Sequence, residues 1–263
     1  MYTYSEEHLL FLKKRKRKKL FVLFFQVLII ISFLVAWEIL ARKNIINTFL
    51  FSSPSNVYKC LMDLYHKNGL FNHIWITTYE TLISFALANV IGIVVGSILW
   101  WNDTLAKVVD PYLTVINSLP KVALGPLIII WVGAGMPAII VMALSISLIV
   151  TILDILNGFL HTDKEKIKMV KTFNANKIQV LTKIVIPSNI PTFFNTLKVN
   201  IGLSLVGVIS GEFLVSKGGL GYLIVYGGQV FQLDLVMTSV IILAGVAALM
   251  YESIVVLEKK IVK

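Results

Sequence analysis

The chain has 263 residues, of which 57% are hydrophobic and 14% charged, and its formal net charge is +10. Soluble domains contain roughly 45–50% apolar and about 25% charged residues, so this composition excludes an ordinary soluble domain. The single cysteine, Cys60, excludes an internal disulfide and a cysteine-based metal site. The four histidines are dispersed without the spacing of metal ligands, and we expect neither a metal nor a cofactor.

The N-terminal part begins with a basic block, residues 13–19, directly before the apolar run 20–41. Such a block can bind nucleic acid, but positive charge beside an apolar segment retains that side of it in the cytoplasm. We therefore predict a basic cytoplasmic N-terminus (1–19), a first transmembrane helix (20–41) and no nucleic-acid partner. A cleaved signal peptide is the alternative, but no small-x-small site follows a short apolar core.

The next segment, residues 42–74, is longer than a tight turn and contains Ser52-Ser53-Pro54-Ser55. A serine cap followed by Val57, Leu61 and Leu64 predicts a short amphipathic helix that lies on the outer face of the membrane that the chain spans.

Five further apolar runs follow, each long enough to cross a bilayer core, which needs about 20 apolar residues of helix. They are residues 75–101, 108–132, 137–160, 187–215 and 233–256. A lipid-exposed backbone must satisfy its own hydrogen bonds, and a barrel would alternate apolar and polar residues. We predict an all-α membrane protein with six transmembrane helices, a five-helix core (75–258) and a cytoplasmic tail (259–263).

The loop charges predict the orientation. With residues 1–19 inside, the cytoplasmic side carries 17 lysines and arginines and the outer side carries five. This is the positive-inside pattern, so we predict that both termini are cytoplasmic.

The inner segment 162–183 has apolar residues at helical spacing and lysines on the opposite face. Asn174 interrupts it, and asparagine tolerates the left-handed conformation that ends helices. The segment therefore predicts helix, break and helix, with Pro187 opening the next span. Two interpretations are open: the helix rests on lipid headgroups, or its apolar stripe docks into a groove on a cytoplasmic partner.

Residues 168–187 resemble the "EAA" coupling loop of ABC importer permeases, a pattern that reads roughly E-A-A-x-x-x-G and, further on, I-x-L-P. The positions that agree with the pattern are Thr172, Ala175, Ile184, Ile186 and Pro187. Lys168 stands in the place of the acidic residue, and Asn174 stands in the place of the glycine and retains its left-handed option.

Other stretches resemble one group of that family, the permeases associated with nitrate, sulfonate, taurine and bicarbonate uptake. These stretches are Ser53-Pro54-Ser55, Asp110-Pro111, residues 119–126 with Trp131, Gly211-Glu212-Phe213 and residues 218–224. The resemblance covers nearly the whole chain from Ser52. It implies a type I ABC importer permease fold in a bacterial inner membrane, with a cytoplasmic coupling helix. It also implies a second copy of the permease, two cytoplasmic ATPase subunits and an extracytoplasmic solute-binding protein. The chain is then no enzyme, and it contains no G-x-x-x-x-G-K-[ST] phosphate loop.

The resemblance assigns the ATPase-coupling contact to residues 167–175. The candidates are Ile167, Lys168, Val170, Lys171, Phe173, Asn174 and Ala175, with Ile167, Val170 and Phe173 as the docking face.

The candidates for the substrate pathway or gate are polar and ionisable residues within spans, because placing such side chains in lipid costs free energy and therefore indicates a function. They are Lys121, Ser145, Ser204, Ser210, Glu212 and Tyr222. Glu212 is expected at a gate or dimer interface, whereas Lys121 lies either in the path or snorkels to the headgroups. The glycine-rich segment 218–222 is either a flexible turn or an outer gate.

The function expected from these observations is ATP-driven, binding-protein-dependent import of a small solute, first of all an anionic sulfonate, taurine or nitrate. A thiamine-precursor pyrimidine or a riboflavin-like compound is the alternative substrate. A stand-alone secondary transporter or channel is the alternative class, and a docking helix argues against it. A membrane-embedded enzyme would need clustered His, Asp, Glu or Cys side chains, which the sequence lacks.

Overall fold

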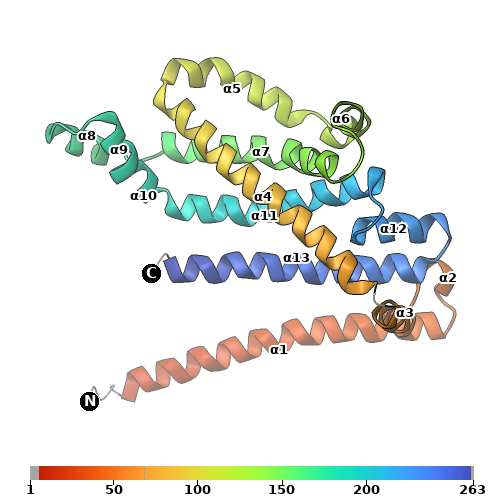
Figure 1. Ribbon diagram of the computed structural model, residues 1–263. Coiled ribbons are helices and arrows are strands. Elements are labelled where there is room, and N and C mark those ends of the chain that lie inside the picture. The colour runs from red at the N-terminus through yellow and green to blue at the C-terminus, as the bar shows by residue number, and fades with distance from the viewer. Residues whose placement is uncertain (1–5, 68, 262–263) are drawn as a thin grey trace.

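The structure, a computed structural model, describes residues 6–67 and 69–261, and every regular element within these ranges is helical (Figure 1). The outermost residues of the predicted N-terminal and C-terminal tails, 1–5 and 262–263, lie outside the described residues. The first helices are α1 (Glu6–Arg42), α2 (Thr48–Phe51), α3 (Pro54–His66) and α4 (Leu70–Trp101). Then follow α5 (Asp103–Ser118), the 3-10 turn η1 (Lys121–Leu124), α6 (Gly125–Val132) and α7 (Met136–Leu160). The inner segment forms α8 (Lys164–Thr172), α9 (Lys177–Val180), the π-helical η2 (Leu181–Val185) and α10 (Ile186–Ser188). The last helices are α11 (Ile190–Val215), α12 (Leu220–Gln229) and α13 (Leu233–Ile261).

Five helices of the described chain are long and apolar enough to cross a membrane, namely α1, α4, α7, α11 and α13. The predicted third span, residues 108–132, is not one helix: α5 and the η1–α6 segment form a pair bent by 84°. The bend has a local cause. Pro120 disfavours helical backbone at Leu119, and Pro126 at the first turn of α6 starts a new helix.

The core is the packing of α4, α7 and α11; α7 and α11 run side by side, and α4 crosses them obliquely (Figure 1). Small residues let the backbones approach: a Cβ at Gly96 of α4 would lie 2.8 Å from the Ile155 side chain of α7. A Cβ at Gly211 of α11 would likewise lie 2.9 Å from the Ile139 backbone. Such close helix contact through small residues is the usual means of association in a membrane.

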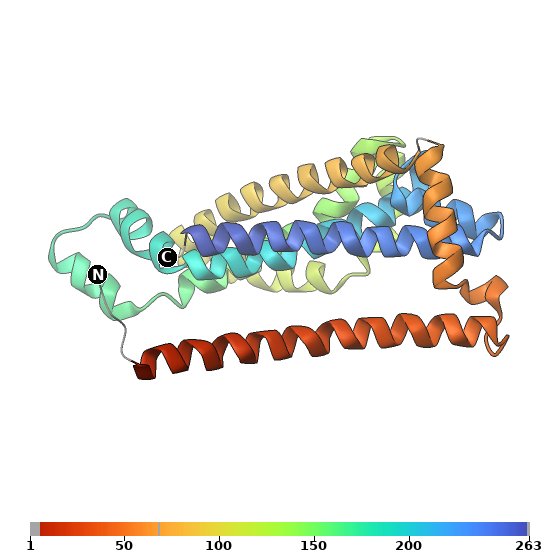
Figure 2. The same cartoon turned by 90° about the horizontal axis from the view of Figure 1, so that it is seen from below.

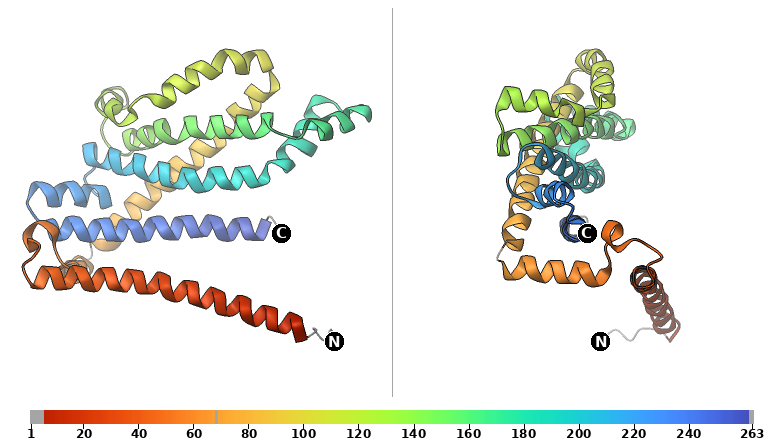
Figure 3. Two further views of the ribbon diagram at one scale, coloured as in Figure 1. Left: turned by 180° about the vertical axis from the view of Figure 1, so that it is seen from behind. Right: turned by 90° about the vertical axis from the view of Figure 1, so that its right-hand side faces the viewer.

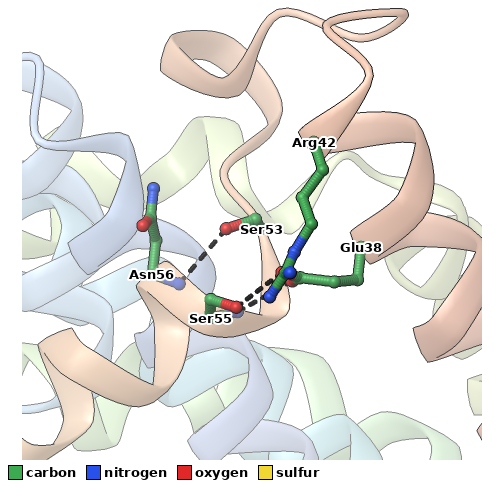
Figure 4. Close-up of polar contacts among 5 residues, drawn as sticks. All are labelled: Glu38, Arg42, Ser53, Ser55 and Asn56. Carbon is green, nitrogen blue, oxygen red and sulfur yellow. Dashed lines mark hydrogen bonds and ion pairs between the residues drawn. The ribbon is translucent and has the colours of Figure 1, made fainter.

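The helix α1 stands apart from this core and contacts the rest of the chain near one end (Figures 2 and 3). There the Glu38 carboxyl accepts hydrogen bonds from the Ser55 hydroxyl (2.6 Å) and backbone N–H (3.1 Å), and from Arg42 (2.6 Å) (Figure 4). Ser53 caps α3, as predicted, by accepting from the Asn56 N–H. An acidic side chain at a helix N-terminus is favourable, so Glu38 fixes α1 to the first turn of α3.

The molecule has two distinct ends (Figure 1). At one end lie α8 and α9, together with the start of α1 and the end of α13. At the other end lie α2, α3 and α12, with the start of α4. The predicted inner segment and the predicted outer interfacial helix are therefore at opposite ends of the bundle.

Candidate functional site

The segment 162–183 folds as predicted, into a helix, a break and a second helix. The Asp163 carboxyl caps α8 by accepting from the Glu165 N–H at 2.8 Å. The helix ends at Thr172, and Asn174 adopts the left-handed conformation with φ 57°. The Ala175 N–H then returns to the Val170 carbonyl at 3.3 Å, which closes the turn. Asn176 and Gln179 form a capping box that starts α9.

The apolar face of this segment points partly towards the bundle. Ile167, Val170 and Ala175 pack against the buried cluster of Ile155, Phe159, Val180 and Val185 at the base of α7. They therefore hold α8 on the bundle. The large apolar side chains left exposed are Met169 (57%), Phe173 (79%) and Ile178 (60%). The α8 surface, defined as these three residues, is flanked by exposed lysines that include Lys168 and Lys171.

Two polar contacts join this segment to the long helices. The Lys177 ammonium donates to the Trp101 carbonyl at the end of α4 (2.5 Å) and lies 5.4 Å from the centroid of its ring. The buried Asn189 amide donates to the Thr162 hydroxyl after α7 (2.8 Å) and to the Val185 carbonyl (2.8 Å). These contacts join the segment to the end of α4, the end of α7 and the start of α11.

At the other end, Glu212 of α11 is 1% exposed and holds the first turn of α12. Its carboxyl accepts from the Thr77 hydroxyl of α4 (2.6 Å) and from the Gly221 (2.5 Å) and Tyr222 (3.3 Å) N–H groups. The Thr77 oxygen in turn accepts from the Leu220 N–H at 2.8 Å. We call Thr77, Glu212, Gly219 and Gly221 the α12 latch. The Glu212 side chain is thus buried within a single chain, and its hydrogen-bond partners come from α4 and α12 of the same copy.

The glycines of the latch make room for the carboxyl. Gly219 has φ +106°, and a Cβ there would overlap the Glu212 carboxyl. A Cβ at Gly221 would lie 2.7 Å from the same carboxyl. Residues 220–229 are helical, and Gly218 and Gly219 form the bend that precedes this helix. His73 also contacts this segment, because its ring accepts a hydrogen bond from the Gly219 N–H at 3.0 Å. No local pattern in the sequence marks Thr77 or His73, because only the tertiary packing brings α4 to α12.

The remaining pathway candidates do not converge on one site. Ser204 is buried inside the bundle, and Ser145 and Ser210 donate to carbonyls of their own helices, those of Met142 and Val206. The Lys121 ammonium donates to the Asn117 carbonyl (2.9 Å) and side chain (3.0 Å) at the end of α5. Tyr222 stacks between His73 and Tyr226.

A shallow polar groove of about 340 Å³ opens between α7 and α11 near the α8 end. Its lining includes Asp154, Asn157, His161, Asn195 and Thr196. The Asp154 carboxyl accepts a long hydrogen bond (3.5 Å) from the Thr196 hydroxyl of α11. In the part of the chain that the structure describes, no group of three or more His, Cys, Asp or Glu side chains could hold a metal ion.

Comparison with known proteins identifies the kind of chain to which this geometry belongs. Residues 88–263 match the family model described as "binding-protein-dependent transport system inner membrane component". A probable ABC transporter permease protein of Haemophilus influenzae is 27% identical over 228 residues, which are 87% of this chain and 92% of the relative. The formylaminopyrimidine transport permease protein of Halalkalibacterium halodurans is 27% identical over 74% of this chain and 77% of the relative. A putative aliphatic sulfonates transport permease protein of Bacillus subtilis is 22% identical over 86% of this chain and 82% of the relative.

The fold is also found among solved structures. A chain of a bacterial ABC transporter involved in the import of the acidic polysaccharide alginate superimposes with a TM-score of 0.68. The match covers 95% of this chain and 100% of that chain, at 14% identity. The all-α permease fold predicted from the sequence is thereby confirmed.

Proposed function

From the premise that this chain belongs to the family of binding-protein-dependent transport inner membrane components, as the match over residues 88–263 shows, we propose that it imports a small anionic solute. The chain is a permease subunit of an ABC importer and a multi-pass membrane protein. Permeases of this family are not enzymes, and ATP hydrolysis lies in a separate subunit. An ATPase and a solute-binding protein are the partners that this family implies.

The observation that carries the ATP-driven part of the proposal is the α8 surface. Three large apolar side chains are exposed on a short segment whose other face is anchored to the core. A large exposed apolar patch marks an interaction site, and helix-in-groove docking uses such anchors. Phe173 is the central anchor, with Met169 and Ile178 beside it and Lys168 and Lys171 at the rim. Docked in a groove of the ATPase, this surface carries the movement of the ATPase to α4, α7 and α11 through Lys177 and Asn189.

We propose that α8, the start of α1 and the end of α13 lie on the cytoplasmic side of the membrane. The excess of lysines and arginines on that side supports this orientation. Two copies of the chain and two ATPase subunits form the membrane complex, and α2, α3 and α12 face the solute-binding protein outside.

The substrate class rests on two observations. Relatives of this chain include a permease named for aliphatic sulfonates and one named for formylaminopyrimidine. Lys121 is a partly exposed cation at the bend between α5 and α6, where an anion arriving from the α12 end would meet it. The anionic sulfonate class is therefore proposed first, and a heteroaromatic pyrimidine is the alternative.

The test replaces the anchor of the α8 surface. We expect Phe173→Glu to lower ATP-dependent uptake more than tenfold, because a buried unpaired carboxylate in the ATPase groove costs more than about 1.4 kcal/mol. Taurine, nitrate and a formylaminopyrimidine serve as parallel labelled solutes in vesicles that contain the assembled importer. The variant should insert into the membrane in normal amount, since Phe173 is 79% exposed in the single chain.

The matched control is Lys164→Glu, which adds negative charge at the start of α8, away from the α8 surface. It should retain uptake and retain the ATPase on purification. Normal uptake by Phe173→Glu would refute the docking proposal. Uptake of the pyrimidine alone would retain the importer and replace the anionic substrate.

A further inference from the structure

The helix α5 carries a polar stripe that the function described so far does not use. The α5 stripe is Asp103, Lys107, Asp110, Thr114, Asn117 and Ser118. The first five members follow one another at spacings of four and three residues, and Ser118 lies four residues after Thr114, so all six lie on one face of the helix. All six are exposed on the surface of the single chain.

The other two faces of α5 are apolar. One of them, with Ala106 and Leu113, is buried against α4 and α7. The second, with Val108, Tyr112 and Val115, is 57–66% exposed. A helix whose free surface met only lipid would be apolar on both of its free faces. The α5 stripe therefore meets a different environment from the face of Val108 and Val115.

The position of the stripe along α5 determines how much free energy its contact with lipid would cost. At 1.5 Å per residue, Asp110 lies about 10 Å and Thr114 about 16 Å along α5 from its start, within a hydrocarbon core about 30 Å thick. An Asp in contact with lipid at mid-helix costs about 2.5–3.5 kcal/mol on insertion scales. Pro111 adds to the polarity, because it has no N–H to donate to the Lys107 carbonyl on the same face.

We propose that the α5 stripe lines a water-filled passage along which the solute crosses the membrane, a proposal that rests on the proposed function. The charges along the stripe are unequal. Asp103, Lys107 and Asp110 lie in the half nearest α8, and Asp103 and Lys107 form an ion pair of 2.8 Å. The other half is uncharged until Lys121, the cation that follows the helix. An anionic solute from the α12 end thus meets an ammonium first, then hydroxyl and amide groups.

The single native cysteine makes the proposal testable by thiol accessibility. In a Cys60→Ala background, Thr114→Cys and Ser118→Cys place a thiol on the stripe, and Val108→Cys and Val115→Cys place it on the apolar face as matched controls. The assembled importer in membrane vesicles is treated with a membrane-impermeant sulfonated maleimide. We expect the two stripe positions to react at least about tenfold faster, because a thiol in apolar surroundings forms less of the reactive thiolate. Taurine at saturating concentration should slow the reaction at Thr114→Cys.

Equal rates on the two faces, or no labelling of the stripe, would overturn the proposal. Unlabelled stripe cysteines that cross-link in pairs on oxidation would also overturn it, because the stripe would then be a contact between two copies. ATP-dependent uptake by the Cys60→Ala parent is measured in the same vesicles. If the parent takes up solute but the stripe is not labelled, only the passage is refuted. If the parent takes up no solute although the ATPase is functional, the importer function itself is refuted.

Discussion

The α12 latch predicts a specific loss of stability on Glu212→Ala. The Glu212 carboxyl accepts hydrogen bonds from the Thr77 hydroxyl and from the Gly221 and Tyr222 N–H groups, all at a residue 1% exposed. Removing the acceptor leaves these donors buried, and each costs about 1–3 kcal/mol. With partial relaxation, the expected total is about 4 kcal/mol, which corresponds to a fall in Tm of about 10 °C.

The assay is thermal unfolding of the detergent-solubilised importer, followed by a double-mutant cycle with Thr77→Val. Because Thr77 donates to Glu212 and also accepts the Leu220 N–H, the two substitutions share one network. The double variant should be more stable than the sum of the single effects predicts, by about 1–2 kcal/mol. Asp163→Ala, which removes an exposed cap, is the control and should cost only about 1 kcal/mol. A Glu212→Ala importer as stable as the wild type, or strictly additive effects, would refute the latch.

Three further predictions concern other parts of the chain. Val170→Glu should lower Tm by several degrees, unlike Phe173→Glu, because Val170 packs on the core; equal Tm values in differential scanning fluorimetry would contradict this. Ser55→Ala should cost about 1 kcal/mol and speed amide hydrogen exchange in the first turn of α3, since the hydroxyl donates to Glu38; unchanged exchange would count against that bond. Burial raises the pKa of the Cys60 thiol, so its alkylation should be slow at neutral pH and accelerate as pH rises; a rate independent of pH would contradict the shift.

Much of the fold follows from patterns that are local in the sequence. The long apolar runs predict the helices, Ser53 predicts the start of α3, and Asn174 predicts the break after α8. Each of these signals acts within a few residues, where capping and backbone conformation decide the outcome.

Other features escape a local pattern because packing decides them. Spacing alone shows that Ile167, Val170 and Phe173 share a helical stripe, but not that the bundle covers the first two and leaves Phe173 free. Glu212 within an apolar run indicates function, yet its partner Thr77 on α4 lies 135 residues away in the sequence, and α12 reaches it only through the bend at Gly218 and Gly219. The α5 stripe, in contrast, could have been found: its four- and three-residue spacing is visible between Asp103 and Ser118, but the expected span began at residue 108 and hid it.

The isolation of α1 has a consequence for how the chain is made. Within the apolar run 20–41, Ala41 is the only buried side chain, and the side-chain hydrogen bonds of this helix to the rest of the described chain join Glu38 to Ser55. Because α1 precedes α4, α7 and α11 in the chain, it can enter the bilayer before they are synthesised. In the orientation that we propose, the basic block at residues 13–19 supplies the charge that retains the start of α1 in the cytoplasm. Since Ser55 follows Glu38 by 17 residues, the Glu38–Ser55 bonds can form only after α1 itself has been synthesised, so insertion of α1 does not require the assembled core.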